Sequence, residues 1–497
     1  MAASGNLFSE LDKLLASQEP SSTPQATIQS LGTPSASIAV LTADGIVSHA
    51  ISSDASPADP DTLYQACSIS KTICGLAILR TIDQGKLSHD DPVTKHLPPE
   101  YIDAISTPRT RKLLEHLTVR HLVSHTGGVT VSGFPGYDCN GSVPSTKTIL
   151  EGSAGSNTPQ IRLSRFPGLK WRYAGGGTTI DQVILETIHG KAYPELVKEL
   201  VFEPLDMTRS FYSLADGEKN FAQCYSTGVT ETAPARYHIQ PELGAAGLWT
   251  TPTDLLKAQR GIRDAALGRN DFLSKDLAQL GLTAIEGANG FTYGCWQRQK
   301  TWFGHGGSNN PGFRCQNVCF YDEGKGRLGK AENEGIAVMT NSALGTEVYL
   351  KIIHAVGYLR GWKGARSEGW LGREDTVVPL MDRNAELDGG WREWKGNWEL
   401  KIGDEEDEIR NDQIVALDED KQGKPTFALG DLPSMDLVKA ATPAIAYDNE
   451  KGEGMELAVD GLDMAVSLGF DGQGERQLRI WPGFWEESID CRRTSQI

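Results

Sequence analysis

Ala66-Cys67-Ser68-Ile69-Ser70-Lys71 is the stretch of sequence around which the fold and the chemistry are organised. The apolar positions from Ile73 to Leu79 continue it with the spacing of a buried helix that ends near Gly85. Residues three apart share one face of a helix, so the Lys71 amine can reach the Ser68 hydroxyl. A helix N-terminus stabilises an anion and lowers the pKa of a nearby ammonium group. Ser68 is therefore the candidate nucleophile, and Lys71 its proton partner.

A tyrosine lies in a glycine-rich loop further along the chain, in Trp171-Arg172-Tyr173-Ala174-Gly175-Gly176-Gly177. Tyr173 precedes an expected helix over 179–190. A tyrosine can share general-base work when neighbouring cations lower its pKa. The alternative is a core tyrosine with a satisfied hydroxyl. The glycine run lacks the Gly-Lys-Ser/Thr ending of a phosphate-binding loop.

A second glycine-rich stretch, Phe303-Gly304-His305-Gly306-Gly307-Ser308, is expected just before a strand. Glycines let a substrate carbonyl approach the backbone, and a strand N–H can then supply one arm of an oxyanion hole. A Gly-x-Ser-x-Gly elbow is missing from the sequence, which argues against an α/β-hydrolase.

The order of the expected elements predicts an α+β fold. An opening helix at 7–15 is followed by a hairpin with strands at 35–41 and from Ile46. Strands return at 293–296, 313–320 and 335–340, and a final helix is expected over 346–359. The helices expected between them lie at about 118–124, 179–190, 194–201 and 252–263. Strands at both ends and helices in the middle indicate a layered α+β domain with an inserted helical part.

The composition changes from about Gly364, where a Gly-, Arg-, Glu- and Trp-rich connector begins. Short alternating segments follow it, including 398–402, 455–459, 464–468 and 477–481. Such segments with polar turns between them predict a small antiparallel barrel. We place the domains at 1–378 and 379–497.

The overall composition excludes several functional classes. The chain has 497 residues, 39% hydrophobic and 23% charged, with a net charge of −17. Such an acidic surface repels phosphate backbones, so we expect no nucleic-acid partner. We also expect no membrane span, and a cytoplasmic location because no signal peptide is seen. The eight cysteines indicate reduced thiols.

Metal dependence is not expected either. His121 and His125 have the helical spacing of a metal-ligand pair, but the glutamate of a His-Glu-x-x-His motif is missing, so a structural or second-shell role is favoured. We expect no metal and no cofactor.

Taken together, residues 30–360 resemble the superfamily of class C β-lactamases, penicillin-binding D-Ala-D-Ala carboxypeptidases and related esterases and D-aminopeptidases. Besides the three stretches above, the matching segments in family order are Gly85-Lys86-Leu87, Asp91-Pro92-Val93, 117–128, 204–208 and 246–251. The resemblance implies a class C β-lactamase-like antiparallel sheet, flanked by helices, with an inserted helical subdomain. The C-terminal barrel resembles the lipocalin-like domain appended to some serine peptidases of this superfamily.

The resemblance also implies roles for individual residues. Ser68 would be acylated, Lys71 would exchange its proton, and Tyr173 would be the general base. His305-Gly306-Gly307 would fill the Lys-Thr-Gly position of the family, and the N–H groups of Ser68 and Ser308 would form the oxyanion hole. Two departures shift the expectation from a β-lactamase towards an esterase, amidase or D-peptidase. Tyr173-Ala174-Gly175 lacks the family's asparagine, and His305 replaces a permanent cation, so carboxylate recognition would be weaker or pH-dependent.

The leading hypothesis is therefore a serine hydrolase that cleaves an ester or amide in a small molecule or peptide through an acyl-enzyme on Ser68. An acyltransferase that delivers the same acyl group to a small-molecule acceptor is the first alternative. An inactive binding protein of the same fold is the second. The substrate, the turnover of β-lactams and the oligomeric state are left open by the sequence.

Overall fold

The computed structural model describes the chain in two compact units. The described residues are 6–17, 23–107, 110–168, 171–226, 236–322, 331, 333–362, 381–382, 387, 389–400, 414–429, 434–440, 455–459, 465–470, 474–481 and 489–493. One unit is Ile28–Tyr349, and the other combines Met1–Thr27 with Leu350–Ile497. The expected boundary between residues 378 and 379 lies outside the described residues and stays a prediction.

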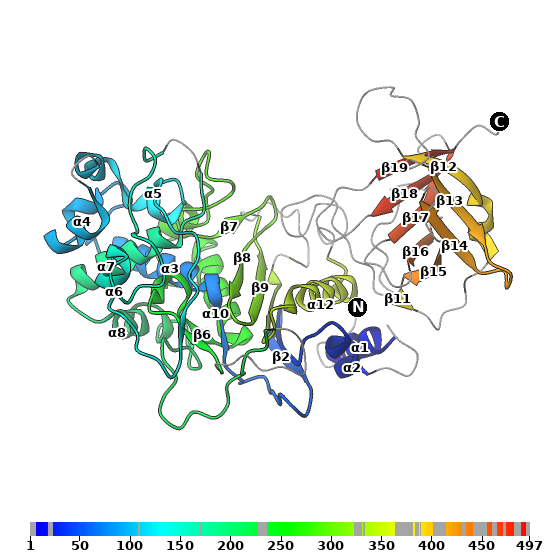
Figure 1. The fold of residues 1–497 in the computed structure, drawn as a ribbon, viewed down its shortest axis with the longest axis horizontal. Coiled ribbons are helices and arrows are strands. Elements are labelled where there is room, and N and C mark those ends of the chain that lie inside the picture. Colours follow the sequence, from blue (N-terminus) through cyan, green and yellow to red (C-terminus); the bar gives the residue numbers. More distant parts are fainter. Residues whose placement is uncertain are drawn as a thin grey trace. The chain divides into compact units, whose positions relative to one another are not determined.

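A six-stranded antiparallel sheet forms the framework of the Ile28–Tyr349 unit (Figure 1). Its strand order is β2-β1-β10-β9-β8-β7, so the first hairpin pairs with strands that come some 300 residues later. The strands are β1 (Ser35–Thr42), β2 (Gly45–Ser52), β7 (Gln297–Arg298), β8 (Trp302–Asn309), β9 (Phe313–Phe320) and β10 (Gly335–Thr340). The predicted hairpin and the strands at 313–320 and 335–340 are confirmed.

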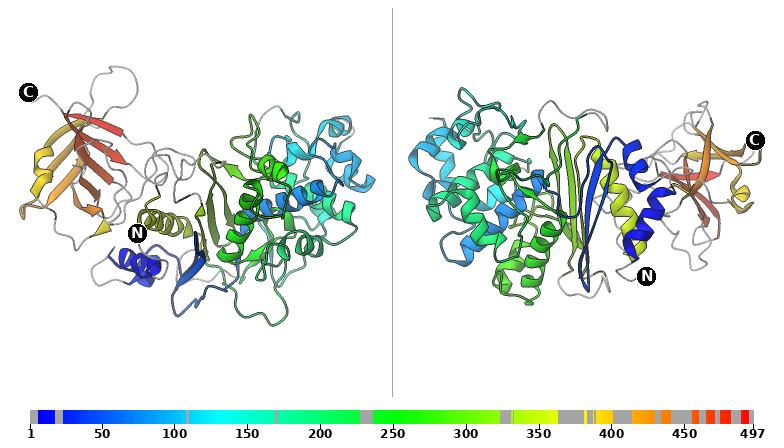
Figure 2. Two further views of the ribbon diagram at one scale, coloured as in Figure 1. Left: turned by 180° about the vertical axis from the view of Figure 1, so that it is seen from behind. Right: turned by 90° about the horizontal axis from the view of Figure 1, so that it is seen from below.

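The segment between β2 and β7 holds the helices of this unit, which gather on one side of the sheet (Figures 1 and 2). The α-helices are α3 (Ser70–Asp83), α4 (Pro99–Ile105), α5 (Val119–Val123), α6 (Thr146–Glu151), α7 (Gly175–His189), α8 (Tyr193–Val197), α9 (Leu243–Ala246), α10 (Pro252–Ala266) and α11 (Lys275–Gly281). The shorter elements are η1 (Cys67–Ile69), η2 (Val93–Lys95), η3 (Arg111–His116), the π-helix η4 (Lys198–Phe202), β3 (Tyr64–Gln65), β4 (Tyr137–Asp138), β5 (His238–Ile239) and β6 (Trp249–Thr250). α10 packs across β1, β9 and β10.

Helix α3 runs through the interior of this helical layer. Eleven of its fourteen residues are buried, which is typical of a helix surrounded by protein on all sides. It contacts α7, α9 and η4. Gly75 allows this packing, because a Cβ there would lie 2.2 Å from the Gly294 carbonyl oxygen. The polar side chains in the first turn of α3, Ser70, Lys71 and Thr72, are therefore removed from water.

The strand predicted over 293–296 is wrong. The chain makes a tight turn there, and the strand β7 begins only at Gln297. The Thr292 hydroxyl accepts hydrogen bonds from the N–H groups of Gly294 and Trp296, and Cys295 has a φ of 62°. Side chain-to-backbone bonds of this kind compete with strand pairing. The apolar residues here face the core from a turn.

The C-terminal strands form a closed antiparallel ring (Figure 1). The strand order is β11-β15-β14-β13-β12-β19-β18-β17-β16, and a further pairing of β15 with β16 closes it. The interior is filled by apolar side chains, among them Trp398, Val415, Leu457 and Leu478. The elements are η6 (Gly389–Trp394), β11 (Met381–Asp382), β12 (Gly396–Leu400), β13 (Ile414–Glu419), β14 (Pro425–Leu429), β15 (Met435–Ala440), β16 (Met455–Val459), β17 (Ala465–Phe470), β18 (Arg476–Trp481) and β19 (Ile489–Arg493).

Three helices remain: α1 (Leu7–Ala16), α2 (Pro24–Ser30) and α12 (Gly345–Arg360). α1 and α12 confirm the expected opening and final helices.

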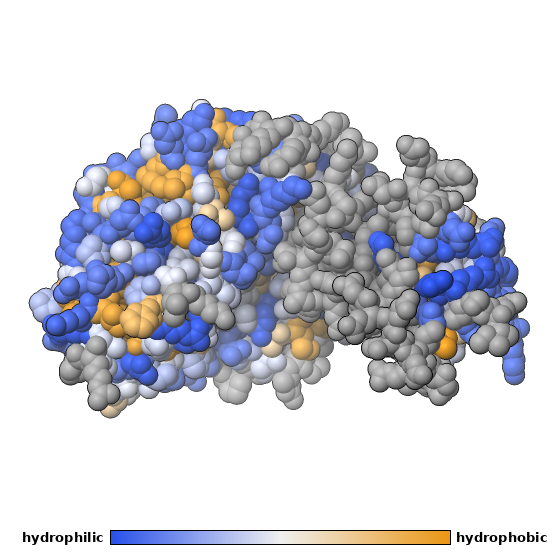
Figure 3. Space-filling view, turned by 90° about the horizontal axis from the view of Figure 1, so that it is seen from above, coloured by the Kyte–Doolittle hydropathy of each residue, from blue (hydrophilic) through white to orange (hydrophobic). Residues whose placement is uncertain are grey.

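Within the described ranges, no helix combines the length and the apolar character that crossing a membrane requires. On the face shown in Figure 3, apolar residues lie in separate patches among hydrophilic ones.

Candidate active site

Ser68 lies in the single 3₁₀ turn η1, which leads directly into α3. Cys67 has a φ of 53°, a left-handed conformation that is uncommon outside glycine. Its carbonyl oxygen is held by the Ser70 hydroxyl at 2.6 Å. Ser68 is half-buried, whereas its two neighbours in the turn are buried. The turn therefore leaves the Ser68 side chain as the one that a substrate can reach.

Lys71 contacts Ser68 from the first turn of α3. Its Nζ lies 3.1 Å from the Ser68 Oγ and donates to the Ala245 carbonyl at 2.7 Å. Only 1% of Lys71 is exposed. Burial lowers the pKa of Lys71 to about 8, and three nearby thiols and the Glu242 carboxyl oppose that shift. The amine is thus close enough to neutrality to exchange a proton with the serine.

Tyr173 lies in the loop before α7, as predicted, and its ring faces Lys71. The Lys71 Nζ is 5.2 Å from the ring centroid. The tyrosine hydroxyl is screened from solvent and finds no hydrogen-bond partner of suitable geometry in the described part of the chain. Burial raises the pKa of Tyr173 far above its ordinary value, against a lowering by the Ser68 hydroxyl. The expectation that cations lower this pKa is therefore wrong, because desolvation outweighs the lowering by the Ser68 hydroxyl.

His305 is buried beside these groups and is neutral at pH 7. Burial, together with the nearby Lys71 ammonium, lowers the pKa of His305 to about 4. Its Nδ1 lies 2.5 Å from the Gly306 carbonyl oxygen, so a neutral ring donates from Nδ1 and leaves Nε2 as an acceptor. That Nε2 is buried and has no partner among the described residues. The expected pH-dependent cation at this position would form only under acid conditions.

The stretch from Phe303 to Ser308 lies inside strand β8 and is followed by β9, so the strand expected after it is present and the stretch is itself a strand. Glycines weaken a strand in isolation, but here they permit close approach of another backbone. A Cβ at Gly304 would lie 2.0 Å from the Asn317 carbonyl oxygen on β9. The glycines of this stretch are therefore part of the sheet and pair with β9.

The outer edge of β8 is free where it passes Ser68. The Gln299 N–H donates to the Trp302 carbonyl at 2.8 Å, and every second residue of a strand directs its backbone groups to the same edge. Ser308 shares this parity with Trp302, whereas the pairing with β7 reaches only to Gly304. The Ser308 N–H therefore points to an edge that β7 leaves uncovered.

Gly307 allows β8 to pack closely against η1, the turn that holds Ser68. A Cβ at this position would lie 2.6 Å from the Ala66 carbonyl oxygen and 2.8 Å from the Cys67 Cβ. Any larger residue would push the strand away from η1. All seven residues singled out from the sequence are thus gathered around η1, the start of α7 and the free edge of β8.

Sequence reasoning did not place three further groups here. The Ala245 carbonyl holds Lys71, and backbone acceptors leave no sequence signal. His125, favoured as structural or second-shell, packs its ring on Tyr173 with centroids 4.3 Å apart. Burial lowers the pKa of His125 well below its usual value. Glu242 is a single acidic residue without a motif, and it lies within electrostatic reach of Lys71.

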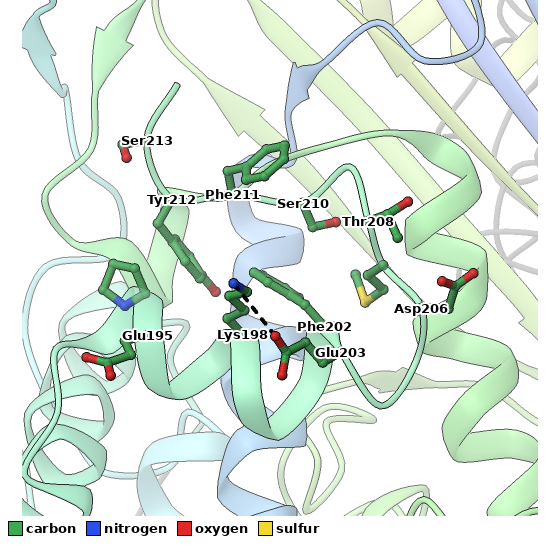
Figure 4. Close-up of a pocket in the computed structure, with 12 residues that line it drawn as sticks. Glu195, Lys198, Phe202, Glu203, Asp206, Thr208, Ser210, Phe211, Tyr212 and Ser213 are labelled. Atoms are coloured by element: carbon green, nitrogen blue, oxygen red, sulfur yellow. Dashed lines mark ion pairs between the residues drawn. The ribbon is translucent and has the colours of Figure 1, made fainter. Parts of the chain in front are cut away.

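A cavity of about 760 Å³ opens elsewhere in the same unit (Figure 4). Aromatic rings of Phe202, Phe211 and Tyr212 form part of its wall. The ion pair between Lys198 and Glu203, 3.7 Å apart, lies beside them. None of the seven predicted site residues lines this cavity.

Comparison with known proteins identifies the family to which the chain belongs. The family model described as Beta-lactamase matches residues 21–356. The chain belongs to this family. Esterase EstB of Burkholderia gladioli is 29% identical over 240 residues, which cover 42% of this chain and 58% of the esterase. The chain thus spans little more than half the length of this curated relative.

Two solved structures of the superfamily extend the comparison at the level of the fold. The octameric penicillin-binding protein homologue from Pyrococcus abyssi matches with a TM-score of 0.53 and 19% identity, covering 99% of this chain and 100% of its own. A D-stereospecific amidohydrolase from Streptomyces sp. matches with a TM-score of 0.50 and 17% identity, covering 70% and 97%. The predicted superfamily is confirmed, as is its α+β class.

Proposed function

We propose that this protein cleaves an ester or amide bond by transient acylation of Ser68. The observation that carries the proposal is the 3.1 Å contact between the Ser68 hydroxyl and a buried Lys71 amine. With a pKa of about 8, roughly a tenth of Lys71 is neutral at pH 7. Family membership and the likeness to an esterase support hydrolase chemistry of this kind.

Acylation uses Lys71 as the base. The neutral amine takes the Ser68 proton while Oγ bonds to the substrate carbonyl carbon. The Tyr173 hydroxyl, kept protonated by its burial, gives its proton to the leaving group as the carbon–leaving-group bond breaks, and the Lys71 ammonium restores that proton. Water then attacks the acyl-enzyme with the same groups in reversed roles. Tyr173 thus acts as a proton carrier instead of the phenolate base expected from the sequence.

Two backbone donors stabilise the oxyanion. The Ser68 N–H lies in η1, just before α3, and the Ser308 N–H points from the free edge of β8. Gly307 keeps the two donors close together.

A neutral His305 selects against substrates that need a permanent cation. Its partner-free Nε2 accepts a hydrogen bond, so a substrate hydroxyl or N–H suits this wall better than a carboxylate. Short acyl esters and uncharged amides are therefore the proposed substrates, ahead of β-lactams.

A fluorophosphonate probe tests the nucleophile directly. We expect labelling of the wild-type protein and none of Ser68→Ala. The matched control is Ser70→Ala, which removes the neighbouring hydroxyl of the same turn. Labelling that survives in Ser68→Ala would refute the assignment.

Tyr173→Phe tests the proton carrier. We expect kcat/KM to fall by ~10²–10⁴-fold, since the variant keeps the aromatic ring and removes the hydroxyl proton that Tyr173 transfers. A rate near that of the wild type would remove Tyr173 from the mechanism.

Product analysis separates hydrolysis from acyl transfer. A panel of short acyl esters, D-amino-acid amides and a chromogenic cephalosporin is assayed with and without a small alcohol or amine. We expect the free acid in both cases. Diversion of most product to the acceptor would identify an acyltransferase, which uses the same acyl-enzyme.

We also propose that the C-terminal ring of strands is lipocalin-like. Its closed antiparallel order and apolar interior support this.

A further inference from the structure

Two buried carboxyl groups lie in the Ile28–Tyr349 unit without an apparent purpose. Glu242 is 0% exposed and Asp181 1% exposed. Both oxygens of each lack a hydrogen-bond partner among the described residues. Burying such a group costs free energy, so a compensating role is expected.

Glu242 is built into the element that holds the catalytic lysine. It caps α9, and its carbonyl oxygen accepts hydrogen bonds from the N–H groups of Ala245 and Ala246 at 3.0 and 2.9 Å. The Ala245 carbonyl, one turn further on, receives the Lys71 ammonium at 2.7 Å. Lys71 and Glu242 are therefore tied to the same short helix.

The two side chains influence each other's ionisation. Burial raises the pKa of Glu242 to about 7, and its own backbone N–H and Lys71 oppose that rise. Burial lowers the pKa of Lys71 to about 8, and Glu242 opposes that fall. The other titratable groups that face Lys71 are Cys67 of η1, Cys74 of α3, Tyr173 before α7, and His125, Cys295 and His305.

Among these neighbours Glu242 supplies the negative charge near neutral pH. Burial raises the pKa of the Cys74 thiol well above its usual range and that of Cys295 to about 12, so both stay protonated. Tyr173 stays protonated for the same reason. His125 and His305 are neutral.

We propose that Glu242 sets the protonation state of Lys71, as a positioning residue that acts through the lysine and never touches substrate. The proposal deepens the proposed function and rests on it. While ionised, the Glu242 carboxylate favours the Lys71 ammonium. When the carboxyl takes up a proton, the amine loses that counter-charge. The two groups titrate as a coupled pair.

The pH profile of kcat/KM for a neutral ester tests the proposal in the full-length protein. In Glu242→Gln the amide keeps the shape and removes the charge, so Lys71 loses its proton more easily. We expect the midpoint of the acidic limb to move by about half a unit to lower pH, because the carboxylate opposes loss of the Lys71 proton only while it is ionised. At pH 6 Glu242 is protonated in the wild type as well, so the two rates nearly coincide. Between pH 7 and 8 the variant is about 1.5-fold faster, and at pH 9 the two rates converge again.

Asp181→Asn is the matched control. Asp181 lies on α7, is equally buried and partner-free, and burial alone raises its pKa well above the usual range. Asp181 raises the pKa values of Cys74 and Cys295, whereas the main influences on the pKa of Lys71 come from other groups. We expect its acidic limb to coincide with that of the wild type. Glu242→Asp, which keeps the charge, is expected to keep the limb near its wild-type position.

An unmoved limb in Glu242→Gln, or an equal shift in Asp181→Asn, overturns the proposal. These results differ from failure of the proposed function, which is seen as labelling of Ser68→Ala by the fluorophosphonate probe. A second readout does not depend on the folding of Glu242→Gln. In Asp181→Asn the infrared band of a buried protonated carboxyl reports Glu242. We expect it to vanish with a midpoint near pH 7 and to persist to higher pH when Lys71→Met is added. A midpoint that Lys71→Met leaves unchanged also overturns the proposal.

Discussion

Replacing Lys71 by methionine should stabilise the protein while abolishing its activity. Burial lowers the pKa of this lysine from 10.5 to about 8. A shift of roughly 2.5 units corresponds to about 3 kcal/mol of free energy lost by keeping the ammonium buried. Lys71→Met removes that cost but leaves the Ala245 carbonyl without its donor, which costs about 1 kcal/mol. The net gain in the free energy of unfolding at pH 7 is therefore about 2 kcal/mol.

The sign of the pH dependence follows from the lowered pKa. The unfolded chain binds the lysine proton up to about pH 10.5 and the folded chain only up to about pH 8, so wild-type stability rises with pH between these values. The penalty is complete below pH 8, and most of it has disappeared by pH 10. The difference between Lys71→Met and the wild type should shrink over this window and then reverse slightly.

Urea denaturation of the full-length protein at pH 7 and pH 10 measures this difference. Ser68→Ala serves as the control, because it is inactive and retains the buried lysine. The reasoning is refuted if Lys71→Met is less stable than Ser68→Ala at pH 7. It is also refuted if the difference between the two variants is the same at both pH values.

Two more predictions concern β8 at the site, and a third concerns the packing of α3. Gly307→Ala should lower kcat by more than tenfold with little change in KM, because its Cβ would push β8 from η1 and misplace the oxyanion donor; a normal kcat would contradict this. His305→Lys should improve the ratio of kcat/KM for carboxylate-bearing over neutral esters, since it adds a permanent cation, and an unchanged ratio would show that this wall does not face the substrate. Gly75→Ala should destabilise the fold by about 1–3 kcal/mol through its clash with the Gly294 carbonyl, measured as a lower urea midpoint.

The sequence was informative where chemistry depends on local spacing. Ser68 and Lys71 share a helical face, so short-range geometry was enough to place them together. The role of Tyr173 followed from the family resemblance. The hairpin and the helices at 252–263 and 346–359 followed from periodicity in the same way.

Features set by long-range packing could not be predicted. The close contact of Gly307 with Ala66 and Cys67 joins residues about 240 positions apart, so only the folded chain shows why a glycine is needed there. The direction of the Tyr173 pKa depends on burial, which only the folded chain determines. Glu242 carries no motif, and the pairing of β15 with β16 that closes the C-terminal ring is invisible in alternating segments.

The free edge of β8 has a consequence for the order in which activity can arise during synthesis. Ser68, Lys71 and Tyr173 all lie in the first 173 residues, but the wall that completes their site begins at Trp302. That wall is fixed through β9 and β10 to β1, so the sheet joins residues about 300 positions apart. Such distant pairing is slow to form. On the proposed mechanism, a nascent chain shorter than about 340 residues would therefore carry Ser68 without its oxyanion hole, and acylation would wait until β10 has left the ribosome.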